Sequence, residues 1–221
     1  MKRVKIAGLI AVIVLSLAVS AQGQFMGGRR GSQPPQMFGA FKPVVGSGAQ
    51  YQVTTQQGTM SFAYVIVGKE DVEGNTGYWM EIRSSGGQMP GEMVMKQLRV
   101  ANGEKSETKR IIMQSPGRPP MEMPASMMNM QRGGAAQASD TDPGVKVGSE
   151  TLTVPGGTFD CEHYRKQTQG GTADVWVSTK VSPYGMVKMT SGEMTMVLEK
   201  VLSNETSHIK GEPQKFEMPK F

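Results

Sequence analysis

The segment TMSFAYVIVG, residues 59–68, decides the fold class, because its large side chains recur at every second position. These side chains are Met60, Phe62, Tyr64 and Ile66. In an extended chain they fall on one side, and the residues between them fall on the other. Such alternation is typical of an antiparallel strand with one face on a core and the other toward water.

Further short runs of β-branched and aromatic residues lie on both sides of this segment. AQYQVTT precedes it, and GYWMEIRSS, EMVMKQLRVANG and TKRIIMQS follow the turn EGNTG, which gives five consecutive predicted strands. After an irregular stretch, strands resume with VKVGSETLTVPGGTFDCEHYRKQ, ADVWVSTKV, MVKMTSG and EMTMVLEKVLS. Consecutive short strands joined by tight turns favour an antiparallel meander. The sequence therefore predicts a mainly β protein with few helices.

The chain begins with MKRVKIAGLIAVIVLSLAVSAQGQ, in which three cationic residues precede an apolar run and then small residues. This order is that of a secretory signal peptide, with cleavage after Ala21 or, nearly as well, after Gly23. The apolar run is shorter than the roughly 18 residues that a membrane-spanning helix needs. The only cysteine is Cys161, so no lipid-attachment cysteine follows the run. We expect residues 1–21 to be removed, leaving a periplasmic or secreted protein without a stable membrane anchor.

Charge and cysteine content exclude two classes of protein. The net charge is +5, but three positive charges lie in the predicted signal peptide, so the mature chain is close to neutral. A nucleic-acid-binding protein is expected to carry a clustered basic face, so no nucleic-acid partner is predicted. A single cysteine excludes an internal disulfide framework. Stability must come from an ordinary apolar core.

The strand pattern divides the mature chain into segments. Residues 22–41 are rich in Gly, Pro and Gln and predict a flexible lead-in. Residues 42–203 predict a single β-rich domain, and the polar residues 204–221 predict a loose C-terminal tail. Within the domain, residues 115–143 are rich in Met, Pro and Gly and lack a strand period, which is typical of a long loop or lid.

The sequence shows no convincing catalytic arrangement. Cys161 and His163 lie two apart on a predicted strand and therefore share a face at about 6–7 Å. A nucleophile pair also needs an orienting group and oxyanion donors, and nothing nearby supplies them. Core packing is the favoured interpretation of the cysteine. Nucleophile elbows, zinc motifs and phosphate loops are absent from the sequence. We predict a non-enzymatic protein without a cofactor.

The insertion contains a cluster of methionines that has three interpretations. Met123, Met127 and Met130 recur at i, i+4 and i+7, one stripe of a short helix, which predicts an adaptable lid on a hydrophobic groove. The second interpretation of the same segment is a disordered linker. The third interpretation is a Cu(I) site, because thioethers such as those of Met121 and Met123 are soft ligands. The chain holds 19 methionines, many in predicted strands, so the bias is not confined to the insertion.

Trp176 is the remaining candidate for ligand binding. In ADVWVSTK it shares a strand face with Asp174 and Ser178, while Val175 and Val177 take the opposite face. A tryptophan on a mixed face either packs on the outer surface or lines a cavity.

The last third of the chain resembles a known family of exported proteins. The matching positions are Gly157, Thr158, Phe159, Trp176, Ser178, Pro183, Gly185, Val187 and Lys188. They form a Gly-Thr-Phe strand, a Trp-x-Ser strand and a Pro-x-Gly-x-Val-Lys turn, similar to the C-terminal meander of the LolA/LolB-like lipoprotein carriers. The resemblance implies a curved antiparallel sheet, an open half-barrel, whose concave face is covered by short helices and receives acyl chains.

Together these observations predict an exported, non-enzymatic protein of the bacterial cell envelope that binds an apolar or lipid-like ligand in a half-barrel groove. Two alternatives stay open: a periplasmic copper-binding protein that uses the methionine segment, and a structural or interaction module that contacts other envelope proteins.

Overall fold

The structure is a computed structural model that describes residues 34–102, 105–123, 141–168, 171–192 and 194–216. The described residues form strands and connecting turns and no helix, so the mainly β prediction is confirmed. The first strands are β1 (Gly48–Thr55), β2 (Gly58–Val72), β3 (Asn75–Gly86), β4 (Met93–Asn102), β5 (Lys105–Gln114) and β6 (Met121–Met123). The later strands are β7 (Val145–Val154), β8 (Gly157–Thr168), β9 (Gly171–Val177), β10 (Met186–Ser191), β11 (Met194–Leu202) and β12 (Gln214–Lys215).

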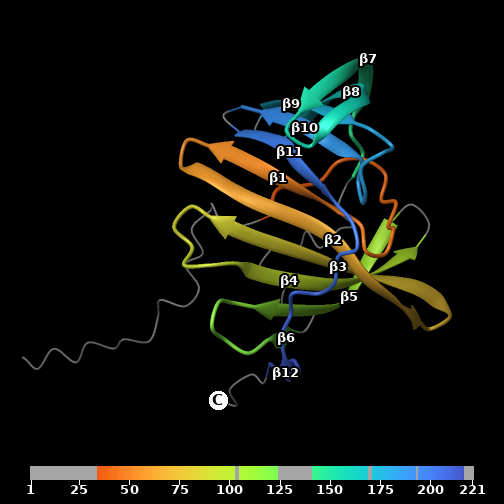
Figure 1. The fold of residues 1–221 in the computed structure, drawn as a ribbon. Coiled ribbons are helices and arrows are strands. Elements are labelled where there is room, and N and C mark those ends of the chain that lie inside the picture. The colour runs from red at the N-terminus through yellow and green to blue at the C-terminus, as the bar shows by residue number, and fades with distance from the viewer. Residues whose placement is uncertain (1–33, 103–104, 124–140, 169–170, 193, 217–221) are drawn as a thin grey trace, which may run out of the picture. The chain divides into compact units, whose positions relative to one another are not determined.

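All these strands belong to one open sheet with the order β12-β6-β5-β4-β3-β2-β1-β11-β10-β9-β8-β7. Figure 1 shows this order running from β7 at the top of the view to β12 at the bottom. Each half is a meander of sequential hairpins, and the β1 and β11 strands pair antiparallel to join the two halves. The short pair between β12 and β6 is parallel.

The turn between β2 and β3 shows how the local sequence sets the register. Val72 pairs with Asn75, so Glu73 and Gly74 form a two-residue loop, and both have positive φ angles, 55° and 79°. Two successive residues in this conformation match the twist of the flanking strands and form the preferred hairpin turn. The Gly74 N–H also donates to Asp71 Oδ1 at 3.1 Å. The predicted turn in EGNTG is therefore present.

The sheet curves at its β7 end. The turn between β7 and β8 reaches back past β9 and β10, and the Gly156 N–H donates to the Leu198 carbonyl on β11 at 3.1 Å. A Cβ at Gly156 would lie 2.8 Å from Leu198 Cγ, so only glycine permits this close approach. The curved, open sheet implied by the family resemblance is thus observed.

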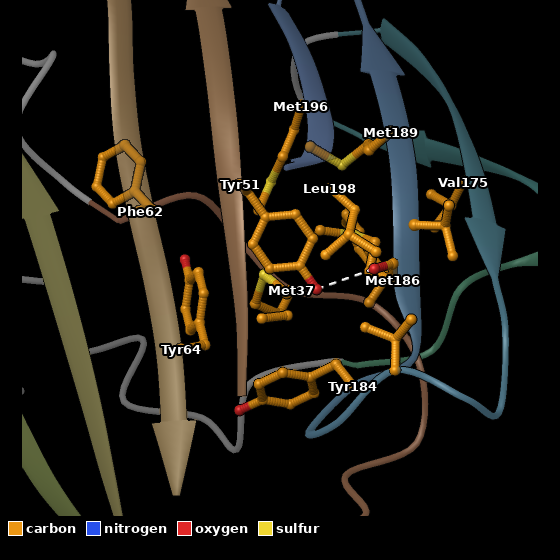
Figure 2. Close-up of a cluster of buried hydrophobic side chains, with 14 of the residues drawn as sticks. Met37, Tyr51, Phe62, Tyr64, Val175, Tyr184, Met186, Met189, Met196 and Leu198 are labelled. Carbon is orange, nitrogen blue, oxygen red and sulfur yellow. Dashed lines mark hydrogen bonds between the residues drawn. The ribbon is translucent and has the colours of Figure 1, made fainter. Parts of the chain in front are cut away.

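The main core lies on one face of the sheet, here called the inner face. Its largest side chains are fully buried and include Tyr51, Phe62, Tyr64, Met186, Met189, Met196 and Leu198. They come from β1 and β11 and from the neighbouring strands β2 and β10. Figure 2 shows these side chains packed together, and its dashed line marks the Tyr51 hydroxyl donating to the Met186 carbonyl at 2.9 Å. Tyr64 packs edge-on against Tyr184 at a centroid distance of 6.4 Å. The alternation predicted around residue 60 therefore marks the core face, but the opposite face does not meet water there, because Ala63 and Val65 are buried in a second cluster with Leu202.

Residues 34–41 also pack into this core, which differs from the flexible lead-in predicted for residues 22–41. Met37 and Phe38 are 6% and 3% exposed. Tyr64 Oη donates to the Pro35 carbonyl at 2.7 Å, and the Gly39 N–H donates to the Thr141 carbonyl at 2.6 Å. The segment lacks a period because it is neither strand nor helix, yet its two large apolar side chains fill the curved inner face.

The start of the C-terminal tail is likewise held, by a buried ionic network on the outer face of β3. Glu81 is fully buried and accepts from Arg83 Nε at 2.8 Å, from Ser207 Oγ at 2.6 Å and from the His208 N–H at 2.9 Å. Arg83 also pairs with Glu205 at 2.6 Å. Buried charges require such partners. The tail from residue 204 was predicted to be loose, and the structure instead shows its first residues covering charged side chains of β3.

If residues 34–41 are part of the core, Phe38→Ala should destabilise the fold by about 3–5 kcal/mol, the usual cost of removing a buried phenylalanine side chain. Urea denaturation of the mature protein measures this change. The control is Val44→Ala, because Val44 is 56% exposed and its loss should cost far less. Equal midpoints for Phe38→Ala and wild type would show that the segment does not pack in solution.

The buried network generates a second prediction. Glu81→Ala should lower the free energy of unfolding by about 3–5 kcal/mol, because it leaves the buried Arg83 guanidinium short of a partner. Glu107→Ala is the control, since it breaks the exposed pair with Lys109, and such pairs contribute about 0–1 kcal/mol. Thermal or urea unfolding of both variants gives the comparison, and equal effects would contradict the role assigned to Glu81.

Candidate functional site

The inner face continues beyond the main core, across β3 to β6, as two rows of register partners. The first row is Ile82, Met95, Met113 and Met121, and the second is Met80, Gln97, Ile111 and Met123. Register partners on antiparallel strands project from the same face with neighbouring Cβ atoms about 4.5–5.5 Å apart. Because Met80 and Ile82 belong to the main core, both rows extend the core face toward the β6 edge.

Burial decreases along the first row. Ile82 is 6% exposed, Met95 and Met113 are half-buried, and Met121 is 38% exposed. In the second row, Ile111 is buried and Met123 is half-buried. We call Met95, Met113, Met121 and Met123 the methionine face. It is an apolar surface that begins in the core and ends in contact with solvent at Met121.

Thioether side chains give this surface two chemical capacities. Methionine is unbranched and polarizable, so it can adapt to apolar ligands of different shapes. The sulfurs of Met95, Met113 and Met121 are carried by neighbouring strands at one register level, and thioethers are also soft ligands for Cu(I). Gln97 Nε2 approaches Met95 Sδ at 3.5 Å, so this sulfur also accepts a weak hydrogen bond.

The β6 strand, which carries two members of the methionine face, is attached to β5 by an ion pair. Arg110 Nε donates to Glu122 Oε1 at 2.7 Å and Arg110 Nη2 donates to Glu122 Oε2 at 3.2 Å. Glu122 lies between Met121 and Met123, so its side chain projects from the opposite face. The hydrogen bonds from Arg110 lower the pKa of Glu122 and outweigh the upward effect of its partial burial.

The structure describes two of the four predicted site residues, Met123 and Trp176, and places them apart in the sheet. Met123 is in the β6 strand opposite Ile111, so it does not start the predicted helical stripe. Met127 and Met130 lie outside the described residues. Trp176 is on β9, near the other end of the strand order from β6, and does not join Met123.

Trp176 instead packs in a polar cluster. Its ring stacks on His163 at a centroid distance of 4.4 Å, and its Nε1–H donates to Glu150 Oε1 at 2.6 Å. His163 Nε2 lies 2.8 Å from Asp174 Oδ1, and Lys188 Nζ lies 5.0 Å from the tryptophan ring centroid. Trp176 is half-buried and also packs against the main core, so its ring and its polar edge both have partners within the chain, and packing fits better than a cavity lining.

Cys161, two residues from His163, is 3% exposed and packs in the main core. Burial raises the pKa of its thiol, and the charges of Asp160 and Glu150 add to that effect. A protonated, buried thiol is a poor nucleophile. Among the described residues, no three His, Cys, Asp or Glu side chains are grouped as a metal site would require.

Sequence reasoning missed Met95 and Met113, although one signal was available. Met93 and Met95 are two apart in a predicted strand, as are Met121 and Met123, and such spacing puts each pair on one face. Which strands lie next to each other, and in which register, is set by tertiary structure.

The described residues include no helix with the length and hydrophobicity needed to cross a membrane. No family model matches the sequence, and no curated protein matches it. Two solved structures are similar in the comparison of folds. One is a predicted lipoprotein from Parabacteroides distasonis, 13% identical, with 76% of this chain and 100% of that chain covered and a TM-score of 0.36. The other is a predicted exported protein with a YmcC-like fold from Bacteroides fragilis, 13% identical, with 76% and 99% covered and a TM-score of 0.33. These scores are too low to carry an inference.

The attachment of β6 generates a prediction about pH. Because the folded-state pKa of Glu122 is lowered from its ordinary value of 4.5, its ion pair stabilises the β6 edge fully above that value. The stabilisation is lost as the pH falls through the folded-state pKa. A carboxyl-detected NMR titration should show Glu122 titrating below its ordinary value, and Arg110→Gln should raise its pKa. Lys109→Gln, on the same strand, is the control and should leave Glu122 unchanged. An ordinary pKa for Glu122 in the wild type would mean that Arg110 does not hold β6.

Proposed function

We propose that this chain is an exported, non-enzymatic protein of the bacterial cell envelope that binds an apolar or lipid-like ligand on its methionine face. The observation that carries the proposal is the decrease in burial along Ile82, Met95, Met113 and Met121, which brings a continuous apolar surface from the core to solvent. Burying this surface against a ligand removes it from water. The favourable free energy is about 25 cal/mol for each Å² of apolar surface buried.

Two further observations support the proposal. The leader MKRVKIAGLIAVIVLSLAVSAQGQ has the order of a secretory signal peptide and predicts export to the periplasm or beyond. The C-terminal meander resembles that of the LolA/LolB-like carriers, and an open, curved sheet with an apolar inner face is the geometry that such a carrier requires. In this chain Met37 and Phe38 already occupy part of the buried cluster on the inner face, so the ligand would occupy the remaining part, over β4 to β6.

A soft-metal binder is the second candidate. The observation that favours it is the alignment of Met95, Met113 and Met121 on three adjacent strands, which offers three thioethers to one Cu(I) ion. A Cu(I) site requires the methionine sulfurs as ligands, whereas an apolar site requires only the volume and flexibility of the side chains. The two candidates therefore predict opposite results for a replacement that keeps the volume and removes the sulfur.

The test is a pair of triple variants at Met95, Met113 and Met121. Replacement by leucine keeps the apolar volume, and such exchanges usually cost less than about 1.5 kcal/mol each, so binding of an uncharged fluorescent long-chain alcohol probe should persist. Replacement by serine removes the apolar surface and should abolish probe binding. The control Val145→Ser/Val147→Ser removes exposed apolar side chains from β7, at the far edge of the sheet, and should have no effect.

A parallel titration with Cu(I) under reducing conditions separates the candidates. Loss of tight Cu(I) binding in the leucine triple variant, with no probe binding by the wild type, would establish the metal site and overturn the lipid proposal. If wild type binds neither probe nor Cu(I), and native mass spectrometry of protein from its own periplasm shows no bound mass, the chain acts as an interaction module instead.

A further inference from the structure

An apolar cavity lies away from the methionine face, where the segment before β1 meets the loop between β9 and β10. Its volume is about 440 Å³, within the range of about 300–1,000 Å³ that small-molecule sites occupy. We call it the valine cleft, defined by Val44, Val177, Val181 and Val201 on its walls and Lys42 and Lys180 beside them. Val44 and Val201 are 56% and 40% exposed, so apolar surface is open to solvent at this place.

The charges around the valine cleft have one sign. Lys42 and Lys180 are both exposed, and no aspartate or glutamate among the described residues lines the cavity. The remaining polar side chains of the lining carry hydroxyl groups, among them Ser178, Ser203 and Tyr184. A smaller cavity of about 260 Å³ beside Arg83 differs, because acids and bases both line it. The valine cleft therefore combines apolar walls with an uncompensated positive rim.

Backbone hydrogen bonds fix the walls of the cleft. The Lys42 N–H donates to the Pro183 carbonyl at 2.7 Å, which ties the segment before β1 to the opposite loop. Two hydrogen bonds of 2.7 Å close the loop itself. The Ser178 N–H donates to the Gly185 carbonyl, and the Gly185 N–H donates to the Val181 carbonyl. Gly185 has a φ of 79°, and a Cβ there would lie 2.8 Å from Val177 Cγ1. A preformed cavity of this kind costs little ordering on binding.

We propose that the valine cleft binds a small anionic amphiphile, a molecule with one short apolar chain and a carboxylate or phosphate head group. The apolar chain of the amphiphile lies against Val44, Val181 and Val201, and its head group contacts the ammonium groups of Lys42 and Lys180. This site goes beyond the proposed function, because it uses none of the methionine face and recognises charge as well as apolar surface.

The test uses the mature protein with octanoate, octyl phosphate and the neutral analogue octanol, followed by amide chemical shifts in two-dimensional NMR. Octanoate should shift the amides of Val44, Val177, Val181 and Val201, and octanol should bind clearly more weakly. Lys42→Gln/Lys180→Gln should weaken octanoate binding by about tenfold or more, since two charge-assisted contacts are lost. The ratio of octyl phosphate to octanoate affinity tells which head group the cleft prefers.

The control Lys69→Gln/Lys210→Gln removes the same charge from exposed lysines outside the cleft and should leave octanoate binding unchanged. Both pairs are at the surface, so the dispersion of the amide spectrum should show that each variant is folded. Equal binding of octanol and octanoate, equal losses in both lysine pairs, or no shifts at the four valines would overturn the proposal. Loss of octanoate binding in the Met95, Met113 and Met121 serine variant would place the amphiphile on the methionine face instead, and would also overturn it.

Discussion

The pairing of β1 with β11 is the constraint on which the rest of the structure depends. β1 begins one meander and β11 ends the other, and their ladder joins Tyr51 to Leu198 and Val53 to Met196 in register. The Tyr51 hydroxyl then reaches the Met186 carbonyl on the next strand but one, so the two halves share a single core. Ladder contacts between residues so far apart in sequence have a high cost in chain entropy. Burial of large side chains from both halves, which Figure 2 shows in one cluster, offsets this cost.

A curved sheet has an inner face that needs filling and an outer face that needs covering, and this chain uses its irregular segments for both. Met37 and Phe38 belong to the buried cluster of the inner face, and the Lys166 ammonium group of β8 lies 5.4 Å from the Phe38 ring centroid. Residues 205–208 cover Glu81 and Arg83 on the outer face and provide their polar partners. What remains of the inner face is the methionine face over β4 to β6. The functional proposal therefore rests on the part of the groove that the described chain leaves partly exposed.

Side-chain alternation was sufficient to predict the strands, because a strand has a period of two that short windows of sequence reveal. Phe62, Tyr64 and Ile66 are buried as expected, and the turn at Glu73 and Gly74 follows from local backbone preference. The candidate site could be predicted less well from the sequence. Met123 was singled out as part of a helical stripe, because Met123, Met127 and Met130 fit a period near 3.6, but the β5 strand pairs with Met121–Met123 and makes this segment extended. Local spacing could not show that a partner strand was available.

The sequence by itself determined the strands, their turns, the apolar face of each strand and the expectation of an export signal, because each depends on residues close together in the chain. Only the tertiary structure decided the order of the strands, the rows that unite Met95, Met113 and Met121, and the packing of Met37 and Phe38. It also decided the burial of Glu81 and Arg83, whose alternation with Met80 and Ile82 predicts a solvated face. Residues 205–208 cover that face, and such coverage depends on where a distant segment of the chain lies after folding.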